Sequence, residues 1–102
     1  MLELRPNCEH CNTALPPDST VAMICSFECT FCSDCVHTVL DNVCPNCGGG
    51  FAPRPVRPMG NRKNCNNLDK YPAGTRIVYK PVDVQAHKAF AAGIKDIPPH
   101  ER

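Results

Sequence analysis

Apolar residues occur along this chain in short clusters, and the first clusters predict two small elements. Val36, Val39 and Leu40 have the i, i+3, i+4 spacing of a single helix face, so they predict a short helix that ends near Asp41. The apolar and β-branched residues within positions 21–31 predict a small β-hairpin before that helix. Elements this short enclose little apolar volume, so a covalent or metal cross-link is expected to stabilise the fold.

The second half of the chain predicts one strand and one helix. β-Branched and aromatic residues at positions 75–80 favour a short strand. Asp83 and Gly93 bracket a short helix, because Asp caps helix N-termini and Gly ends helices. The spaced positions of this helix are Val84, His87, Ala91 and Ala92.

A stretch that resists both helix and central strand lies between these halves, because prolines and arginines alternate in it after three glycines. The pattern divides the chain into a module at residues 1–50, a Pro/Arg-rich basic linker at 51–64 and a C-terminal extension at 65–102. The extension is too short for a core of its own. We expect it to dock on the module, to pair with another chain or to stay partly mobile.

Cysteine is the residue that can supply the missing cross-link. The chain has 9 Cys in 102 residues, and eight of them lie between Cys8 and Cys47, which is the density of a disulfide or metal scaffold. The N-terminus has no apolar run typical of a signal peptide, and no stretch approaches the roughly 18 apolar residues of a membrane span. We therefore expect a cytoplasmic protein whose reduced thiols bind metal.

The eight clustered cysteines form four pairs with metal-ligand spacing. The pairs are Cys8 and Cys11, Cys25 and Cys29, Cys32 and Cys35, and Cys44 and Cys47. A Cys-x2-Cys pair suits Zn²⁺ because a tight turn aims both sulfurs at one ion while backbone N–H groups bond the thiolates. Eight thiolates make two tetrahedral sites, so we expect two structural zinc ions. Spacing alone leaves a sequential and an interleaved pairing open.

The order and spacing of these pairs resemble the RING finger over residues 8–47. Two strings carry the resemblance, Phe31-Cys32-Ser33-Asp34-Cys35-Val36 and Cys44-Pro45-Asn46-Cys47. The resemblance implies a small metal-stabilised α+β fold, in which a two-zinc cross-brace holds a β-hairpin and a short helix. It also implies the interleaved pairing. One zinc would be bound by Cys8, Cys11, Cys32 and Cys35, and the other by Cys25, Cys29, Cys44 and Cys47.

A longer set of motifs resembles a family of short bacterial cysteine-rich proteins that is known only as a domain of unknown function. The motifs lie at residues 1–8, 24–32, 44–49 and 54–58. The resemblance covers the chain up to position 58 and implies zinc binding, but it supplies no activity.

Ubiquitin ligation is the activity that the RING likeness implies. Ligases of that type contact a conjugating enzyme through apolar residues and a proline, and a basic residue past the last ligand presses on the ubiquitin conjugate. Here the corresponding positions hold His10, Pro45 and Gly48, and the chain has no Trp. Only the proline fits, so we expect the cross-brace to be a scaffold and keep ligase activity as a second alternative.

The net charge of the chain changes at the same boundary as its composition. Residues 1–50 hold one base and six acids, whereas residues 51–102 hold ten bases and four acids. Thiolate ligation of two zinc ions would take the first half to a net charge of about −9. The basic 51–80 tail therefore has three possible roles: it binds nucleic-acid phosphates, it lies against the acidic module of its own chain, or it is a solvated linker. Its leading cluster comprises Arg54, Arg57, Arg62 and Lys63.

The remaining candidate residues have structural interpretations. Eight cysteines complete two closed sites, so His10 and His37 are expected to be exposed neighbours or hydrogen-bond donors. Cys65 is expected to be an incidental free thiol, although nearby bases could make it reactive. Three acids near the cysteines have no paired base and are expected to be surface charges: Glu9, Glu28 and Asp34. We predict a non-enzymatic zinc-binding adaptor that binds a protein partner, with nucleic-acid binding through the 51–80 tail as the alternative.

Overall fold

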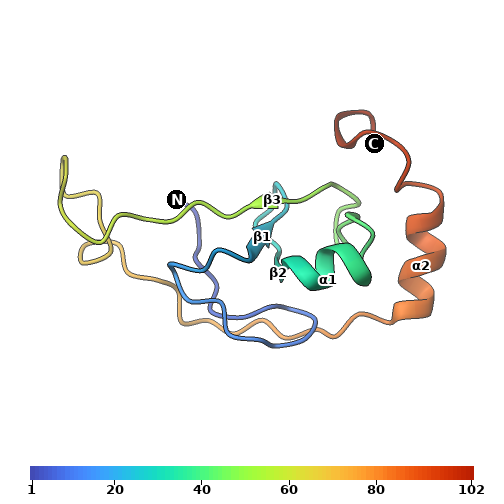
Figure 1. Ribbon diagram of the computed structural model, residues 1–102, viewed down its shortest axis with the longest axis horizontal. Helices are drawn as coiled ribbons and strands as arrows, with labels where there is room; N and C mark the ends of the chain where they lie inside the picture. Colours follow the sequence, from blue (N-terminus) through green and yellow to red (C-terminus); the bar gives the residue numbers. More distant parts are fainter.

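A computed structural model describes all 102 residues, and its elements are few and short. They are β1 (Ala22–Ile24), β2 (Thr30–Cys32), α1 (Ser33–Thr38), β3 (Ala52–Pro53), α2 (Val84–Ala92) and a 3-10 turn, η1 (Pro99–Glu101). Figure 1 shows the strands and α1 in the middle of an elongated molecule, with a loop at one end and α2 at the other. The fold is the small α+β type that the sequence predicts. None of its helices has the length and apolar character that a membrane span requires.

The predicted hairpin is formed by β1 and β2. These strands pair antiparallel with Met23 opposite Phe31, and β3 adds to the free side of β1 with Pro53 opposite Met23. The sheet order is therefore β2-β1-β3. The sequence did not predict β3, which lies in the stretch assigned to the linker. An edge position suits this strand because Pro53 has no N–H to offer a further neighbour.

The predicted first helix is present as α1, and its apolar face is the buried one. Val36 and Leu40 have no exposed surface. The helix ends at Thr38, before the expected position. The chain then turns through Asp41 and Asn42, which both have left-handed backbone, with φ of 53° and 57°. This turn directs the chain back toward the sheet and the last cysteine pair.

The core is small, and cysteine side chains make up much of it. Six of the eleven residues of the buried cluster are cysteines. The bulkiest buried apolar side chains are Phe31, Leu15 and Leu40. Phe31 meets Phe51 edge to face, with ring centroids 5.5 Å apart. A core with so few large apolar groups depends on what its sulfur atoms bind.

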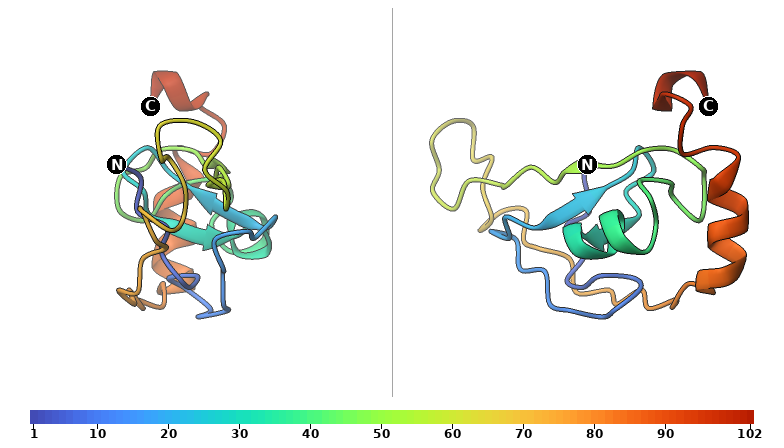
Figure 2. Two further views of the ribbon diagram at one scale, coloured as in Figure 1. Left: turned by 90° about the vertical axis from the view of Figure 1, so that its left-hand side faces the viewer. Right: turned by 45° about the vertical axis from the view of Figure 1, so that its right-hand side comes forward.

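The second half of the chain encircles the first. From β3 it runs to the loop at one end of the molecule and returns along the opposite side to α2 (Figure 1; Figure 2, right). Backbone hydrogen bonds attach the returning segment to the N-terminal segment. The N–H of Gly74 donates to the Leu4 carbonyl and that of Lys80 to the Glu9 carbonyl, both at 2.9 Å. Of the three outcomes expected for the extension, the structure has docking on the module.

Ion pairs also join the two halves. Arg76 contacts Glu3 at 2.7 Å, and Lys88 contacts Asp41 at 3.1 Å. Hydrogen bonds from Arg76 and then Arg5 lower the pKa of the Glu3 carboxyl from 4.5 to about 2. The stabilisation from this carboxylate is therefore present above pH 4.5 and is lost as the pH falls toward 2. These contacts match the opposite charges of the two halves.

The prediction of a strand at residues 75–80 is wrong. These residues join no ladder. The carbonyl of Val78 instead accepts a hydrogen bond from the Asn7 side chain at 2.9 Å. The N-terminal segment beside them is irregular, with a single isolated bridge between Asn7 and Ala14, so the strand-forming residues have no strand to pair with.

The helix predicted after Asp83 is confirmed as α2. The Asp83 carboxylate accepts a hydrogen bond from the N–H of Ala86 at 3.1 Å, and Gly93 caps the C-terminus. Two of its side chains are buried, His87 and Ala91. The His87 Nε2 lies 2.9 Å from the Leu40 carbonyl oxygen, which fixes α2 against the turn that follows α1.

Two arginines of the Pro/Arg stretch point inward. Arg54 is only 4% exposed, and burial lowers the pKa of its guanidinium. Arg57 donates to the carbonyls of Leu2 and Tyr71 at 2.8 and 2.7 Å. The acceptors of Arg54 are the carbonyls of Arg5, Leu15 and Pro16, at 2.8 to 3.2 Å. The division of the chain at residues 50 and 64 stays a prediction, but this stretch is firmly attached to the module.

Replacing Arg54 with Met should destabilise the protein, although the sequence predicts that this arginine lies in a linker. The variant keeps an apolar stem but loses the guanidinium that donates to three carbonyls, of which only the Pro16 carbonyl keeps another donor, the Ser19 N–H. We therefore expect a loss of about 2–3 kcal/mol in the free energy of unfolding. Urea unfolding of the zinc-loaded protein measures it. Arg62→Met is the matched control, because Arg62 is exposed and makes no hydrogen bond. Equal stability of the two variants would contradict a structural role for Arg54.

Candidate metal centres

The first candidate metal centre joins two segments that are far apart in the sequence. The sulfur atoms of Cys8, Cys11, Cys32 and Cys35 all lie within 4.8 Å of one another. Cys8 and Cys11 come from the N-terminal loop, Cys32 ends β2, and Cys35 lies in the first turn of α1. The first pair thus meets the third pair. These are the four residues of the first predicted ligand set, and they follow the interleaved order.

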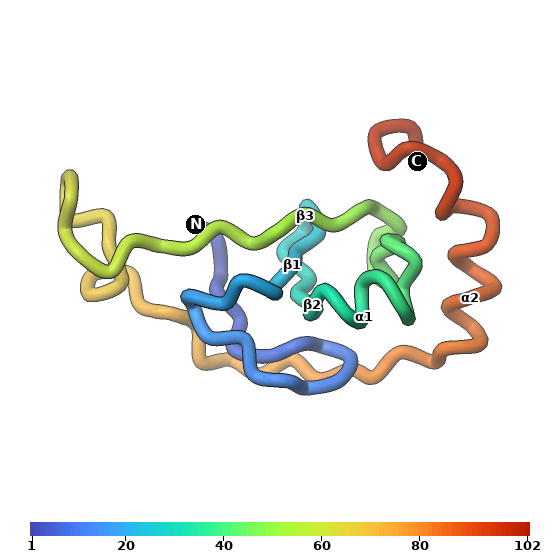
Figure 3. The backbone as a smooth tube through the Cα atoms, in the orientation of Figure 1, coloured from blue at the N-terminus to red at the C-terminus, as the bar shows by residue number.

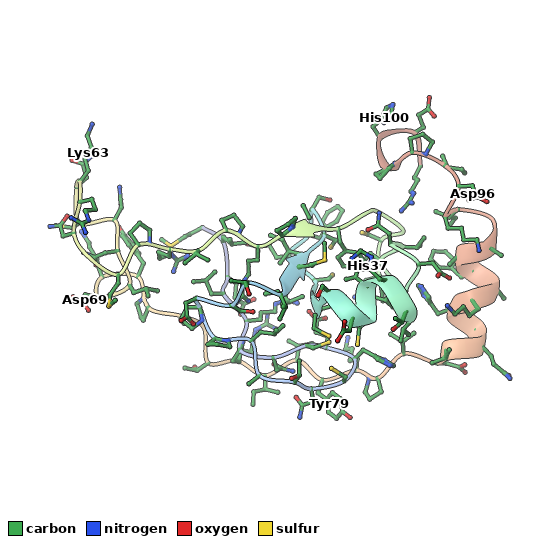
Figure 4. All side chains as sticks on the ribbon, viewed as in Figure 1. His37, Lys63, Asp69, Tyr79, Asp96 and His100 are labelled. Carbon is green, nitrogen blue, oxygen red and sulfur yellow. The ribbon has the colours of Figure 1, made fainter.

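The second candidate centre joins the hairpin to the loop before β3. The sulfur atoms of Cys25, Cys44 and Cys47 lie within 4.8 Å of one another. Cys29 is not in this group, but Asn46 beside it donates its side-chain N–H to the Cys29 sulfur at 3.4 Å. The structure therefore brings together three of the four predicted ligands and leaves the Cys29 sulfur at their margin. Figure 4 shows several sulfur atoms near the sheet and α1.

The first and last cysteine pairs lie on loops of the same backbone geometry. In each loop the N–H four residues after the first cysteine donates to the carbonyl of that cysteine, from Asn12 to Cys8 at 3.0 Å and from Gly48 to Cys44 at 2.8 Å. Asn12 and Gly48 both have left-handed backbone, with φ of 64° and 77°. Gly and Asn are the residues that tolerate this conformation best. The same turn therefore recurs around a Cys-x2-Cys pair at both ends of the module.

Backbone N–H groups point at several of the sulfur atoms. In each case the donor is two residues after the cysteine that accepts. The bonds run from Phe27 to Cys25 at 3.3 Å, from Asn46 to Cys44 at 3.4 Å and from Gly49 to Cys47 at 3.4 Å. Such bonds favour the thiolate, which is the form that binds metal.

The separation of the sulfur atoms suits a tetrahedral ion. Cys11 Sγ and Cys32 Sγ are 3.8 Å apart, and every cysteine is free. A disulfide has an S–S length of about 2.05 Å. Two sulfurs at about 2.3 Å from one tetrahedral Zn²⁺ lie roughly 3.8 Å apart. The first centre therefore has the donor type and the spacing of a four-thiolate zinc site.

The thiols of each group cannot all ionise without a cation. Burial raises the pKa of Cys35 and of Cys44 far above the ordinary thiol value, and neighbouring cysteines add to the rise. Burial also acts to raise the pKa of Cys8, but backbone N–H groups of Cys11, Cys32 and His10 outweigh it, so the pKa is lowered. The pKa shifts within the first group therefore run in opposite directions, downward for Cys8 and upward for Cys35. Occupation of the site by a divalent ion must release protons.

Comparison with known proteins places the chain in a family. Residues 1–57, more than half of the chain, match the family described as "Protein of unknown function (DUF1272)". The chain belongs to this family. An uncharacterized protein of Rhizobium meliloti (strain 1021), R02474, is 58% identical over 81 residues, which are 79% of this chain and 89% of the relative. No solved structure matches.

The similarity extends beyond the part that defines the family. The 81 residues shared with the relative exceed the 57 of the family match, so part of the encircling second half is shared as well. All eight clustered cysteines lie inside the family region. Both candidate centres therefore belong to the family's own segment of the chain.

One of the acids near the cysteines has a different place from the predicted one. Glu9 is 3% exposed and is not a surface charge. Its carboxylate accepts hydrogen bonds from the Arg5 guanidinium, at 2.8 Å, and from the backbone N–H of Thr30. Glu28 is half-buried and accepts from a backbone N–H, whereas Asp34 is exposed. No local pattern could predict the burial of Glu9, because its partner on β2 is distant along the chain.

The histidines and the ninth cysteine lie outside both groups. His10 accepts a hydrogen bond at Nδ1 from the N–H of Val82, 2.9 Å away, so it holds the returning segment. His37 is exposed on α1. Cys65 is exposed in the distant loop, where its neighbour is Asn61. None of the three joins a sulfur cluster.

Zinc titration in two buffers of different ionisation enthalpy should show both the number of sites and the protons they release. We expect two zinc ions per chain and about three to four protons released per ion, because a thiol with an ordinary pKa is protonated at neutral pH and must lose its proton to bind zinc. Isothermal titration calorimetry measures both quantities. Zinc affinity should therefore fall as the pH falls. Heats that do not depend on the buffer would contradict thiolate ligation.

Cysteine variants separate the ligands from the free thiol. Cys11→Ser should lower the zinc content toward one ion per chain, because it removes a member of the first group. Cys65→Ser is the matched control and should leave it at two. Equal zinc content in both variants would exclude the proposed ligand set.

Proposed function

We propose that the protein is a structural zinc-binding module with a RING-like cross-brace, which acts as a protein-interaction adaptor. The observation that carries the proposal is the interleaving of the cysteine groups. The segment that holds Cys8 and Cys11 meets the start of α1, and the segment that holds Cys25 meets the last pair. Two ions bound in this order would each join segments that are distant in sequence, which is the arrangement of a cross-brace.

We assign the two zinc ions a structural role. Four thiolates complete the tetrahedron of a zinc ion and leave no open position for water or substrate. Zinc bound there would supply charge compensation to sulfurs that otherwise form much of the core. Cys8, Cys11, Cys32 and Cys35 would hold one ion, and Cys25, Cys29, Cys44 and Cys47 the other. Such a module presents surfaces to partners rather than reacting groups to a substrate.

A ubiquitin-ligase role has little support from the surface. Of the positions that would contact a conjugating enzyme, His10 is bonded to Val82. A hollow beside Pro45 is lined by residues of the returning segment and α2. Gly48 packs near the ring of Phe90. The chain's own second half thus occupies the neighbourhood of all three positions.

Nucleic-acid binding stays a prediction, and fewer cations are free for it than the sequence suggests. Arg54 and Arg57 donate to carbonyls of their own chain. Arg76 pairs with Glu3. Phosphate contacts would therefore fall to exposed bases such as Arg62 and Lys63 in the loop.

Affinity capture with the zinc-loaded full chain tests the adaptor proposal. A nuclease-treated lysate of the organism of origin is passed over the immobilised protein at moderate salt. We expect a protein that is retained by the wild type and by Cys65→Ser, is lost from Cys25→Ser or after chelation, and returns when zinc is restored. If no protein is retained, and nucleic acid is instead retained from a parallel lysate that has not been treated with nuclease, with a steep loss as salt rises, the nucleic-acid alternative would replace the adaptor.

A further inference from the structure

The segment that follows the last cysteine pair has a three-residue period of burial. Phe51 is half-buried, Arg54 is buried and Arg57 is half-buried, while the residues between them are exposed. Three residues per turn, with no internal hydrogen bonds, is the pattern of a polyproline II helix. No hydrogen bond joins residues within 54–58 to one another. Figure 3 shows this stretch as a nearly straight run of tube from β3 to the loop.

The buried side of this extended segment fixes its position on the module. Phe51 packs edge to face on Phe31. Arg54 and Arg57 together donate to five backbone carbonyls, at 2.7 to 3.2 Å. The extended conformation is therefore already ordered in the free protein, before any partner binds.

The two other faces carry exposed apolar side chains and no charge. We name them together the proline ribbon, which comprises Pro53, Pro55, Val56, Pro58 and Met59. Val56 is 55% exposed and Met59 is 78% exposed. With three residues per turn, Pro55 and Pro58 share one face, and Val56 lies on the other with Pro53 and Met59. Both arginines of the stretch are turned away from the ribbon.

We propose that the proline ribbon is a ligand for an aromatic-lined groove on another protein. Grooves of this kind bind a preformed polyproline II segment through its apolar ridges. Two exposed faces suffice for such contact, so the third can remain attached to the module. Because the ribbon is already ordered, binding costs little conformational entropy. The inference rests on the adaptor function proposed above and names the surface and the kind of partner.

Two basic residues beside the ribbon indicate the charge that the partner's groove should carry. Arg62 and Lys63 follow it, are exposed and make no ion pair. Figure 4 shows Lys63 at the tip of the loop, pointing away from the rest of the molecule. A groove that receives the ribbon would therefore carry acidic residues at the end nearest to Lys63.

Capture with ribbon variants of the zinc-loaded full chain tests the proposal. We expect the retained protein to bind Pro55→Ala/Pro58→Ala about tenfold more weakly than the wild type. The retained protein should bind the matched control, Pro72→Ala/Pro98→Ala, with the same affinity as the wild type. Both of these prolines are exposed but lie outside the ribbon. A free proline decamer should displace the retained protein from the wild-type chain. The aromatic fluorescence of the retained protein should change when the wild-type chain is added. Zinc content and circular dichroism verify that the variants are folded.

Two outcomes would overturn the inference. A zinc-dependent partner that binds the Pro55→Ala/Pro58→Ala chain with unchanged affinity, or that the proline decamer does not displace, would place the interaction elsewhere and leave the adaptor function intact. The absence of any zinc-dependent protein partner would instead remove the adaptor function itself, and the ribbon proposal with it.

Discussion

The fold depends on compensating the charge of sulfur atoms that are packed inside it. Cysteines make up six of the eleven residues of the buried cluster, and burial raises the pKa of thiols such as Cys35 and Cys44. A structural zinc site contributes about 10–16 kcal/mol of apparent binding free energy, as much as the whole stability of a typical domain. The hairpin and α1 are too short to hold together without such a contribution.

Charge also explains how the second half of the chain is placed. The first half is acidic and thiolate ligation of two zinc ions would make it more so, whereas the second half is basic. The contacts are specific as well as electrostatic, because Arg54 and Arg57 reach backbone carbonyls of the N-terminal segment and Arg76 reaches Glu3. Because Arg54 and Arg57 bind the module, the exposed prolines of this segment, rather than these arginines, are available to other molecules.

Features set by neighbouring residues could be predicted from the sequence, and those set by distant ones could not. The hairpin, α1 and the Asp83-capped α2 depend on local spacing and capping. Residues 75–80 do not form the predicted strand, whereas β3 forms without having been predicted. Both outcomes depend on whether another strand lies alongside. Glu9 is buried by a partner on β2, for which no local pattern exists. Spacing likewise identified the cysteine pairs, but their meeting in interleaved order is a property of the folded chain.

X-ray absorption spectroscopy of the zinc-loaded protein tests the central claim most directly, because it reports the ligand atoms around the metal. Two four-cysteine sites predict a first shell that contains only sulfur, with four atoms at about 2.3 Å from each zinc. The result is also sensitive to Cys29, whose sulfur lies at the margin of the second group. A shell that includes nitrogen or oxygen would contradict the account, since at least one site would then be completed by something other than cysteine.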